Sequence, residues 1–366
     1  MSYARHVSKD NTPYEDVVDQ LQDSGHPVEK GGFQLPRLRM KSISHRGMDL
    51  RALRVATGSA VATFGPDYIS YPPLHLLLGA NGYMQPPTGF LTDKFLIPAQ
   101  EFMKKYLVHG AGYAHGRRGT AEVMTRQGRY SVGHIQDDVA EDTKAIIEWL
   151  QIRAVRPVPT VLMGHSQGGQ HVAHQLADPE KYGLKRDQIR GVVLINSMLL
   201  PHSQQMLLTP GFFKEIALSS LGRVAGSMIT GKGLLFRGQK AFDAFVGEGD
   251  PNGKNERRIT EGTYPDSGMF FTQTVTTGTS PSLKDARLKG LPVSIIVSED
   301  DQLMGKNLQY KTADYLDSFG ADVRIMDVPG KHLSPLMTHT GESPERVELI
   351  MDQHRQALAH AFQNLR

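Results

Sequence analysis

Ser166 is the centre of the stretch Gly164-His165-Ser166-Gln167-Gly168, which has glycine two positions before and two positions after the serine. This G-x-S-x-G spacing is typical of a serine on a sharp turn, because side chains at the flanking glycines would collide with neighbouring backbone. A serine hydroxyl is a weak nucleophile at neutral pH. It needs a base within hydrogen-bond reach, and the base needs an acid that holds its tautomer. We therefore interpret Ser166 as a candidate nucleophile and expect a histidine and a carboxylate elsewhere in the chain.

The residues around this motif predict a strand, a tight turn and a helix. Pro159 to Met163 is a short apolar run, typical of a strand that is covered on both faces. Gln170 to Gln175 contains no helix breaker, and Gly169 allows the helix to pack closely on the strand. The first N–H groups of such a helix, starting with that of Gln167, point toward the space above Ser166. We expect an oxyanion to form there.

Extended to Gly169, the motif resembles the nucleophile elbow of the α/β-hydrolase superfamily in its lipase and esterase-like form. The resemblance implies an α/β-hydrolase fold, with a mostly parallel sheet, helices on both faces and a helical cap inserted after strand six. It also implies a serine nucleophile, then an acid, then a histidine, in that order along the chain.

The acid is expected among three consecutive carboxylates that follow a predicted buried strand, Pro292 to Val297. In the superfamily the strand is followed by a small residue, two variable residues and then the acid. This pattern puts Ser298 in the small position and implies Asp301 as the acid. Asp300 is the close rival, and it could instead be a solvated turn carboxylate.

The base is expected after the last predicted strand, Asp322 to Val328, in the loop where the superfamily carries its histidine. His332 lies in that loop. His165, His171 and His174 lie too near Ser166 in local strand or helix geometry to serve as the base. The resemblance therefore implies a triad of Ser166, Asp301 and His332.

The second oxyanion donor has two candidates. Leu74 to Leu78 predicts a buried strand that runs into Gly79-Ala80-Asn81-Gly82, where the superfamily ends its third strand, and this implies the N–H of Ala80. The rival is the glycine-rich stretch Gly110 to Gly116, which resembles the His-Gly-Gly-Gly turn of hormone-sensitive-lipase-like esterases and offers Ala111 or Gly112.

We prefer Ala80 because the later elements then follow the superfamily's order with none missing. Those elements are a helix that begins at Pro98, a strand from Tyr106 to His109, a helix from Gln136 to Leu150 and the serine motif. If the strand at Tyr106 were the third strand, a helix and a strand would have to be lost before the motif.

The chain divides into four parts, with boundaries given by predicted strands and by composition. Residues 1–35 are a polar N-terminal extension that precedes the predicted sheet. Residues 36–201 form the first part of the hydrolase core, and residues 289–366 form its second part. Further predictions are a hairpin from Arg37 to Thr57, a buried strand from Arg190 to Asn196 and a helix after Ser343-Pro344-Glu345. Trp149, the only tryptophan, is expected to take part in the packing of the predicted helix from Gln136 to Leu150.

Residues 202–288 are predicted to form the cap or lid, with helical pieces from Gly211 to Met228 and from Leu234 to Val246. Phe213 and Met228 are candidate substrate-binding residues that would line an acyl pocket. For most apolar residues in this segment, packing of the cap against the core is the simpler interpretation.

Composition and short motifs argue against several other classes of protein and site. The 366 residues carry a formal net charge of +3 without a basic block, so no nucleic-acid partner is expected. The absence of cysteine excludes disulfides, Cys-based zinc sites and a cysteine nucleophile. Neither an H-E-x-x-H nor a phosphate-binding loop motif is found, so we expect no metal and no cofactor. A polar start and the lack of an apolar run of about 20 residues predict a soluble, cytoplasmic protein without a membrane segment.

Together these features predict a serine hydrolase that cleaves a carboxylic ester with an apolar acyl part. A thioesterase or an acyltransferase would use the same triad. A different class, a non-catalytic ligand-binding protein on the hydrolase fold, is the further alternative.

Overall fold

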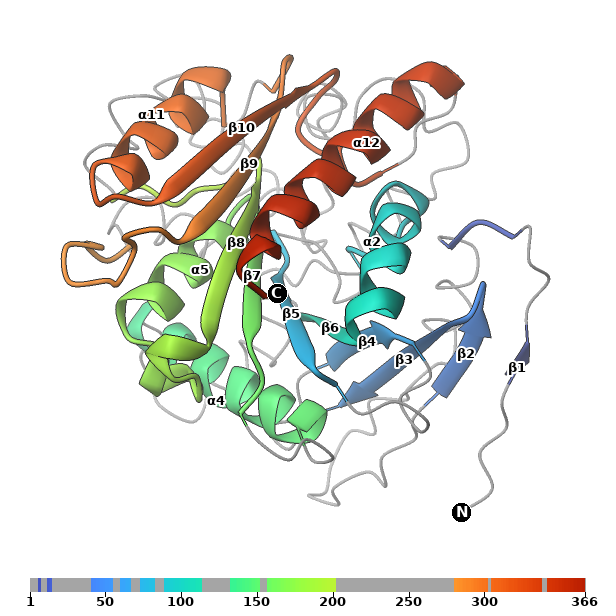
Figure 1. The fold of residues 1–366 in the computed structure, drawn as a ribbon, viewed down its shortest axis with the longest axis horizontal. Helices are drawn as coiled ribbons and strands as arrows, with labels where there is room; N and C mark the ends of the chain where they lie inside the picture. The colour runs from blue at the N-terminus through green and yellow to red at the C-terminus, as the bar shows by residue number, and fades with distance from the viewer. Residues whose placement is uncertain are drawn as a thin grey trace, which may run out of the picture.

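The computed structural model describes residues 6–7, 12–14, 41–54, 60–66, 73–82, 89–113, 132–151, 157–201, 280–301, 304–337 and 341–365. Their strands form one ten-stranded sheet in the order β1-β2-β3-β4-β6-β5-β7-β8-β9-β10 (Figure 1). In chain order the strands are β1 (His6–Val7), β2 (Lys41–His45), β3 (Met48–Arg54), β4 (Ala60–Gly65), β5 (His75–Ala80), β6 (Val108–Tyr113), β7 (Thr160–His165), β8 (Ile189–Ile195), β9 (Pro292–Ser298) and β10 (Asp322–Val328). All pairs from β6 to β10 are parallel, whereas β3 is antiparallel to β2 and β4, and β4 is antiparallel to β6.

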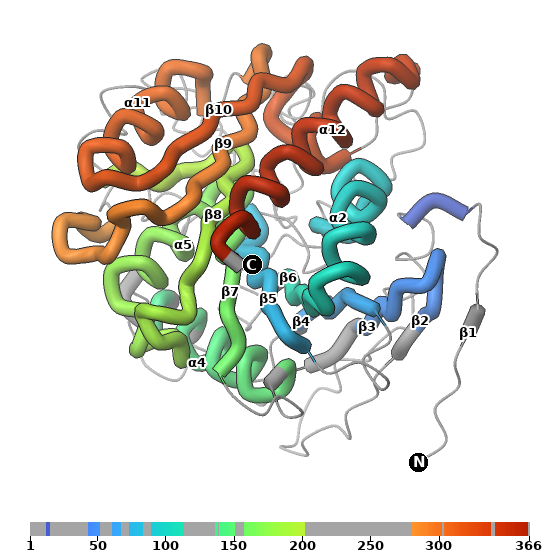
Figure 2. The backbone as a smooth tube through the Cα atoms, in the orientation of Figure 1, coloured from blue at the N-terminus to red at the C-terminus, as the bar shows by residue number. Residues whose placement is uncertain are grey.

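Helices cover both faces of the sheet (Figure 1). On one face lie α4 (Val132–Gln151), α5 (Gly168–Ala177) and α11 (Lys306–Asp317). On the other face α2 (Asp93–Tyr106) packs beside α12 (Pro344–Ala361), which Figure 2 traces as neighbouring tubes. Successive strand residues serve opposite cores: Leu76 and Leu78 belong to the first and Leu77 to the second. The short helices η1 (Pro179–Tyr182), η2 (Arg186–Gln188) and η3 (Gln363–Leu365) complete the described helices.

The parallel strands end at a common edge. Ala80 at the end of β5 is in register with Gly164 in β7, and Ile195 at the end of β8 is in register with Ile296 in β9. The ends of β9 and β10 are also level, since Ser298 pairs with Val328. Turns that follow β5, β7, β8, β9 and β10 therefore meet at the carboxyl edge, which is where ligands bind in open α/β sheets.

Most predicted elements are confirmed. The strands expected around the motif and near the C-terminus are present as β5, β7, β8, β9 and β10, and the expected helix with Trp149 packed against the core is α4. The predicted hairpin is β2 and β3. Its two-residue turn, Arg46-Gly47, has positive φ at both positions, as tight hairpins require. The Ser343 side chain caps α12 by accepting the N–H of Arg346.

The sequence predicted a strand from Tyr106 to His109 and a glycine-rich loop from Gly110, but the structure continues the strand into this stretch. Residues 108–113 form β6, paired with β4 on one side and β5 on the other. The glycine at position 110 serves packing, because a side-chain carbon there would overlap the ring of Phe64. The strand β4, which supplies Phe64, was not predicted, since its alanines and bordering glycine carry little strand signal.

The start of one helix was predicted wrongly, and one strand and one helix were not predicted. Helix α2 begins at Asp93 after Thr92, so Pro98 lies inside the helix and not at its first position. Burial of Phe95 and Leu96 in the core stabilises this earlier turn. Residues His6–Val7 join the sheet as β1, although the N-terminal extension was expected to precede it, and α11 was not predicted.

The predicted cap is described only at its C-terminal end. Residues 280–288 contain no helix or strand, and Leu283 and Leu288 are buried in the core that contains α4 and α5. The two predicted cap helices lie outside the described residues. In the part of the chain that is described, no helix is both long and apolar enough to cross a membrane.

Candidate active site

Ser166 occupies a strained turn between β7 and α5. Its φ is 52°, in the left-handed region that side-chain-bearing residues rarely adopt. Neighbouring backbone holds it there: the Ser166 N–H donates to the carbonyl oxygen of Ile195 at 3.0 Å, and the Met198 N–H donates to the carbonyl oxygen of Ser166 at 2.8 Å. The strand, sharp turn and helix predicted around the serine are therefore present.

The glycines of the motif are explained by close packing. A side-chain carbon at Gly168 would overlap the backbone oxygen of Ala80. One at Gly164 would lie 2.9 Å from the backbone of Gly168, and one at Gly169 would lie 2.7 Å from the Cβ of Ser197. These glycines let the start of α5 approach the ends of β5 and β8, which brings the turns of three strands together around Ser166.

Asp301 and His332 lie in the turns after β9 and β10 and contact each other. The Nδ1 of His332 is 2.8 Å from Oδ2 of Asp301, and each side chain is only 1% exposed. The other carboxylate oxygen of Asp301 accepts the backbone N–H of Met304 at 3.0 Å. Because a carboxylate only accepts hydrogen bonds, the proton lies on Nδ1 of His332, and Nε2 carries the lone pair that a base requires.

The other two carboxylates of this turn are exposed. The backbone N–H groups of Glu299 and Asp300 donate to carbonyl oxygens of Val328 and Gly330, and these bonds leave both side chains in solvent. Of the three consecutive carboxylates, Asp301 is the one that the structure brings to His332.

His165 connects the serine turn to the histidine turn. Its ring centroid is 5.0 Å from that of His332, and its Nε2 lies 3.4 Å from the carbonyl oxygen of His332. Burial lowers the pKa of His165 well below its ordinary value, and the neighbouring His332 lowers it further. His165 therefore stays neutral at physiological pH, and its contact with His332 joins the turn of Ser166 to that of His332.

The candidates for the second oxyanion donor, Ala80 and Ala111, have different settings relative to the first donor, Gln167. Gln167 is the N-cap residue of α5, directly after Ser166, and Ala80 ends β5 against Gly168, so their backbones lie on adjoining segments. Ala111 is inside β6, where it pairs with Thr63 and Leu78. The strands on either side of β7 are β5 and β8, and β5 is the neighbour expected if it is the third strand of the hydrolase order.

The expected substrate-binding residues, Phe213 and Met228, lie outside the described residues. Within the described ranges, no group of three or more His, Cys, Asp or Glu side chains is arranged to hold a metal ion.

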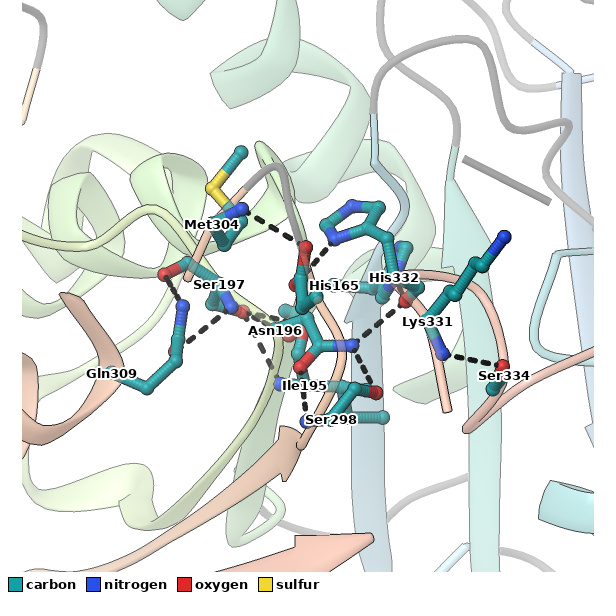
Figure 3. A network of polar contacts seen from close by, with 12 residues as sticks. His165, Ile195, Asn196, Ser197, Ser298, Met304, Gln309, Lys331, His332 and Ser334 are labelled. Atoms are coloured by element: carbon teal, nitrogen blue, oxygen red, sulfur yellow. Dashed lines mark hydrogen bonds and ion pairs between the residues drawn. The ribbon is translucent and has the colours of Figure 1, made fainter. Parts of the chain in front are cut away.

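Asn196, directly after β8, was not singled out by the sequence. Its side chain bonds to the turns of both Asp301 and His332 (Figure 3). A buried strand that ends in a polar residue is a weak signal, because only the folded sheet shows which turns are adjacent.

A search of protein-family profiles and a search of curated proteins found no match to this sequence. Solved structures with a similar fold include an esterase/lipase from an uncultured bacterium, at 15% identity, 95% of this chain, 98% of that chain and a TM-score of 0.43. A bacterial heroin esterase is 16% identical over 86% of this chain and 85% of its own, with a TM-score of 0.47. A soluble variant of monoglyceride lipase from Saccharomyces cerevisiae is 14% identical over 90% of this chain and 98% of its own, with a TM-score of 0.44.

The fold follows from the chain's own geometry. β5 lies between β6 and β7, and β4 is antiparallel to β6, while the strands from β6 to β10 run parallel. A serine with positive φ stands on the turn after β7, and an aspartate and a histidine follow the last two strands. This strand order, with its elbow serine and helices on both faces of the sheet, is that of an α/β-hydrolase fold.

Proposed function

We propose that this protein hydrolyses carboxylic esters through an acyl-enzyme on Ser166. The bond between His332 and Asp301 carries the proposal, because it places the proton on Nδ1 and so gives the lone pair to Nε2, the atom that a general base uses. Ser166 itself stands on a strained turn at the same edge of the sheet. A buried histidine that is bonded to a carboxylate, and a serine in a strained conformation, are the three groups that general base catalysis of acyl transfer uses.

In the proposed reaction His332 takes the hydroxyl proton of Ser166 while the serine oxygen attacks the ester carbonyl carbon. The resulting oxyanion accepts hydrogen bonds from the backbone N–H groups of Gln167 and Ala80. His332 then returns the proton to the leaving alcohol, and the carbon–oxygen bond to that alcohol breaks. Water, deprotonated by His332, then attacks the acyl-enzyme. The bond between the acyl carbon and the Ser166 oxygen breaks, His332 returns the proton to that oxygen, and the acid is released, while Asp301 stabilises the imidazolium in both steps.

The leaving group and the final acceptor define the competing functions. A thioester would follow the same steps, and an acyltransferase would replace water by another nucleophile. Turnover of esters, thioesters and amides of graded acyl length, with and without added alcohols, separates these reactions. A ligand-binding protein without catalysis would show no burst of acylation with an activated ester.

The first prediction is that Ser166→Ala abolishes turnover while the fold is retained, because only the nucleophile is removed. Losses on the order of 10⁶ in kcat are typical of such changes. A fluorophosphonate should add to the wild-type protein at Ser166, as mapped by mass spectrometry, and not to the variant. Turnover that persists in pure Ser166→Ala protein would rule out the mechanism.

A further inference from the structure

Asn196 is a buried residue that bonds to the turns of both the acid and the base (Figure 3). Its Nδ2 donates to Oγ of Ser298 at 2.8 Å and to the carbonyl oxygen of His332 at 2.7 Å. Its Oδ1 accepts the backbone N–H of Ser298 at 2.8 Å. Both donors of the amide are thus in use, and no other type of side chain of this size offers two donors and an acceptor.

The backbone around Asn196 also holds the serine turn. The preceding residue, Ile195, accepts the N–H of Ser166, and Met198 donates to the carbonyl oxygen of Ser166. Asn196 itself has a φ of 44°, a left-handed conformation that asparagine tolerates better than most residues. The segment 195–198 therefore contacts the turns of all three proposed catalytic residues.

We propose that Asn196 is a positioning residue that sets the place of His332 relative to Ser166 and Asp301; this inference rests on the proposed hydrolase function. The base and the acid follow β10 and β9, whereas the nucleophile follows β7, with β8 between them. A hydrogen bond from Asn196 to the backbone of His332 itself fixes the base across that gap. Misplacement of a catalytic group by about 1 Å can cost roughly 10²-fold in rate.

The test compares two changes of amide to carboxylate at equally buried positions. Asn196→Asp keeps the size of the side chain and the acceptor for Ser298, but it loses the donor to His332. The control is Gln309→Glu. Gln309 is 1% exposed, accepts the N–H of Ser197 at 3.2 Å and donates to the carbonyl oxygen of Ser197 at 3.1 Å. Both substitutions remove a buried amide donor to a backbone carbonyl oxygen. That oxygen belongs to His332 for Asn196 and to Ser197 for Gln309, so only the first substitution removes the contact with His332.

The readouts are kcat and KM for p-nitrophenyl acetate and the rate of Ser166 labelling by a fluorophosphonate, with thermal unfolding measured alongside. We expect Asn196→Asp to lower kcat and the labelling rate by about 10²-fold with little change in KM. Gln309→Glu should lower the unfolding temperature and leave kcat of the folded protein unchanged. Asn196→Gly, which keeps the left-handed backbone and adds no charge, should repeat the kinetic loss if Asn196→Asp fails to fold.

The contrary outcomes are distinct. Wild-type kcat in both Asn196 variants, or an equal loss of kcat in Gln309→Glu, overturns the positioning role. Failure of the wild-type protein to label at Ser166 overturns the proposed function. The positioning role is then tested without activity, by the low-field proton NMR resonance of the hydrogen bond between His332 and Asp301. A shift or loss of that resonance in Asn196→Gly but not in Gln309→Glu supports it, and an unchanged spectrum contradicts it.

Discussion

At the scale of single residues, burial separates three carboxylates that the sequence presents in a row. Asp301 is 6% exposed as a residue and bonds to the imidazole of His332, while its two predecessors face solvent. A buried carboxylate is costly unless it is hydrogen-bonded, and Asp301 has both an imidazole and a backbone N–H as donors. The contact with His332 is therefore specific to one position in the turn.

The second prediction tests this position. Asp301→Asn should lower kcat by about 10⁴, by comparison with triads in other hydrolases, because an amide can stabilise the wrong tautomer of His332. Asp300→Asn is the matched control, one residue away and in solvent, and should leave kcat nearly unchanged. A larger loss of kcat in Asp300→Asn than in Asp301→Asn, measured with the same activated ester, would assign the role of the acid to Asp300.

At the scale of elements, a buried ion pair ties α2 to the turn after β10. The Nζ of Lys94 is fully buried and donates to the carbonyl oxygens of Ser334 and Met337, each at 2.8 Å. Its counter-ion is Glu342, with Nζ to Oε2 at 2.6 Å. The three acceptors match the three donors of an ammonium group, so the chain that follows His332 is held at several points.

The third prediction concerns this pair. Lys94→Met should lower the free energy of unfolding by roughly 3–5 kcal/mol, because it leaves the carboxylate of Glu342 buried with a large part of its compensation removed. The double variant Lys94→Met with Glu342→Gln should recover much of that loss, since no buried charge then lacks a partner. Arg346, which also pairs with Glu342 at 3.3 Å, has a side chain that is 38% exposed and can be solvated by water. Urea denaturation measures both. A double variant that is less stable than the single variant by a full additive increment would contradict the ion-pair account.

The fourth prediction belongs to the proposed cap, residues 202–288. Connections of this length are usually functional when ordered, and burial of acyl chains stabilises binding by about 0.8 kcal/mol per CH₂. We expect Phe213→Ala or Met228→Ala to change the preferred acyl length, while short activated esters still acylate Ser166 at near wild-type rates. Equal losses for short and long esters in a folded variant would show that the segment is not a cap.

Two of the strands that the sequence predicted are buried along their whole length. All residues of β7 and β9 are buried, so an apolar run was sufficient to predict them. By contrast, β4 and β6 depend on each other, because Phe64 of one fills the space left by Gly110 of the other. Pro98 marked a helix start by local preference, yet core packing begins the helix at Asp93. Pairings of this kind are not visible in a local pattern.

At the scale of the whole molecule, buried histidines make stability depend on pH. His354 of α12 is fully buried, donates from Nε2 to the carbonyl oxygen of Pro335 at 2.9 Å and packs edge-on against Phe95. Burial, with a smaller effect of Lys94, lowers its pKa from 6.5 to about 4. The folded protein therefore binds this proton less readily than the unfolded chain does.

The fifth prediction follows from the sign of that difference. Between pH 6.5 and pH 4 the unfolded chain holds more protons, so the free energy of unfolding should decrease as the pH falls. For His354 alone the loss is about 3 kcal/mol. Urea denaturation from pH 7 to pH 4.5 measures the slope, and His354→Met should reduce it. An equal slope in the variant would assign the effect to other groups, such as His165.

The packing of α12 on α2 has a consequence for the time at which the site forms. The elbow of Ser166 is translated long before β10, which must pair with β9 to bring His332 to it, and before α12, which must reach back to residues 93–106. Contacts between such distant parts of a chain form slowly, since long loops have to close first. A nascent chain thus exposes the serine turn while its base is still absent, so under the proposed mechanism the serine cannot react with esters before the C-terminal strands have folded.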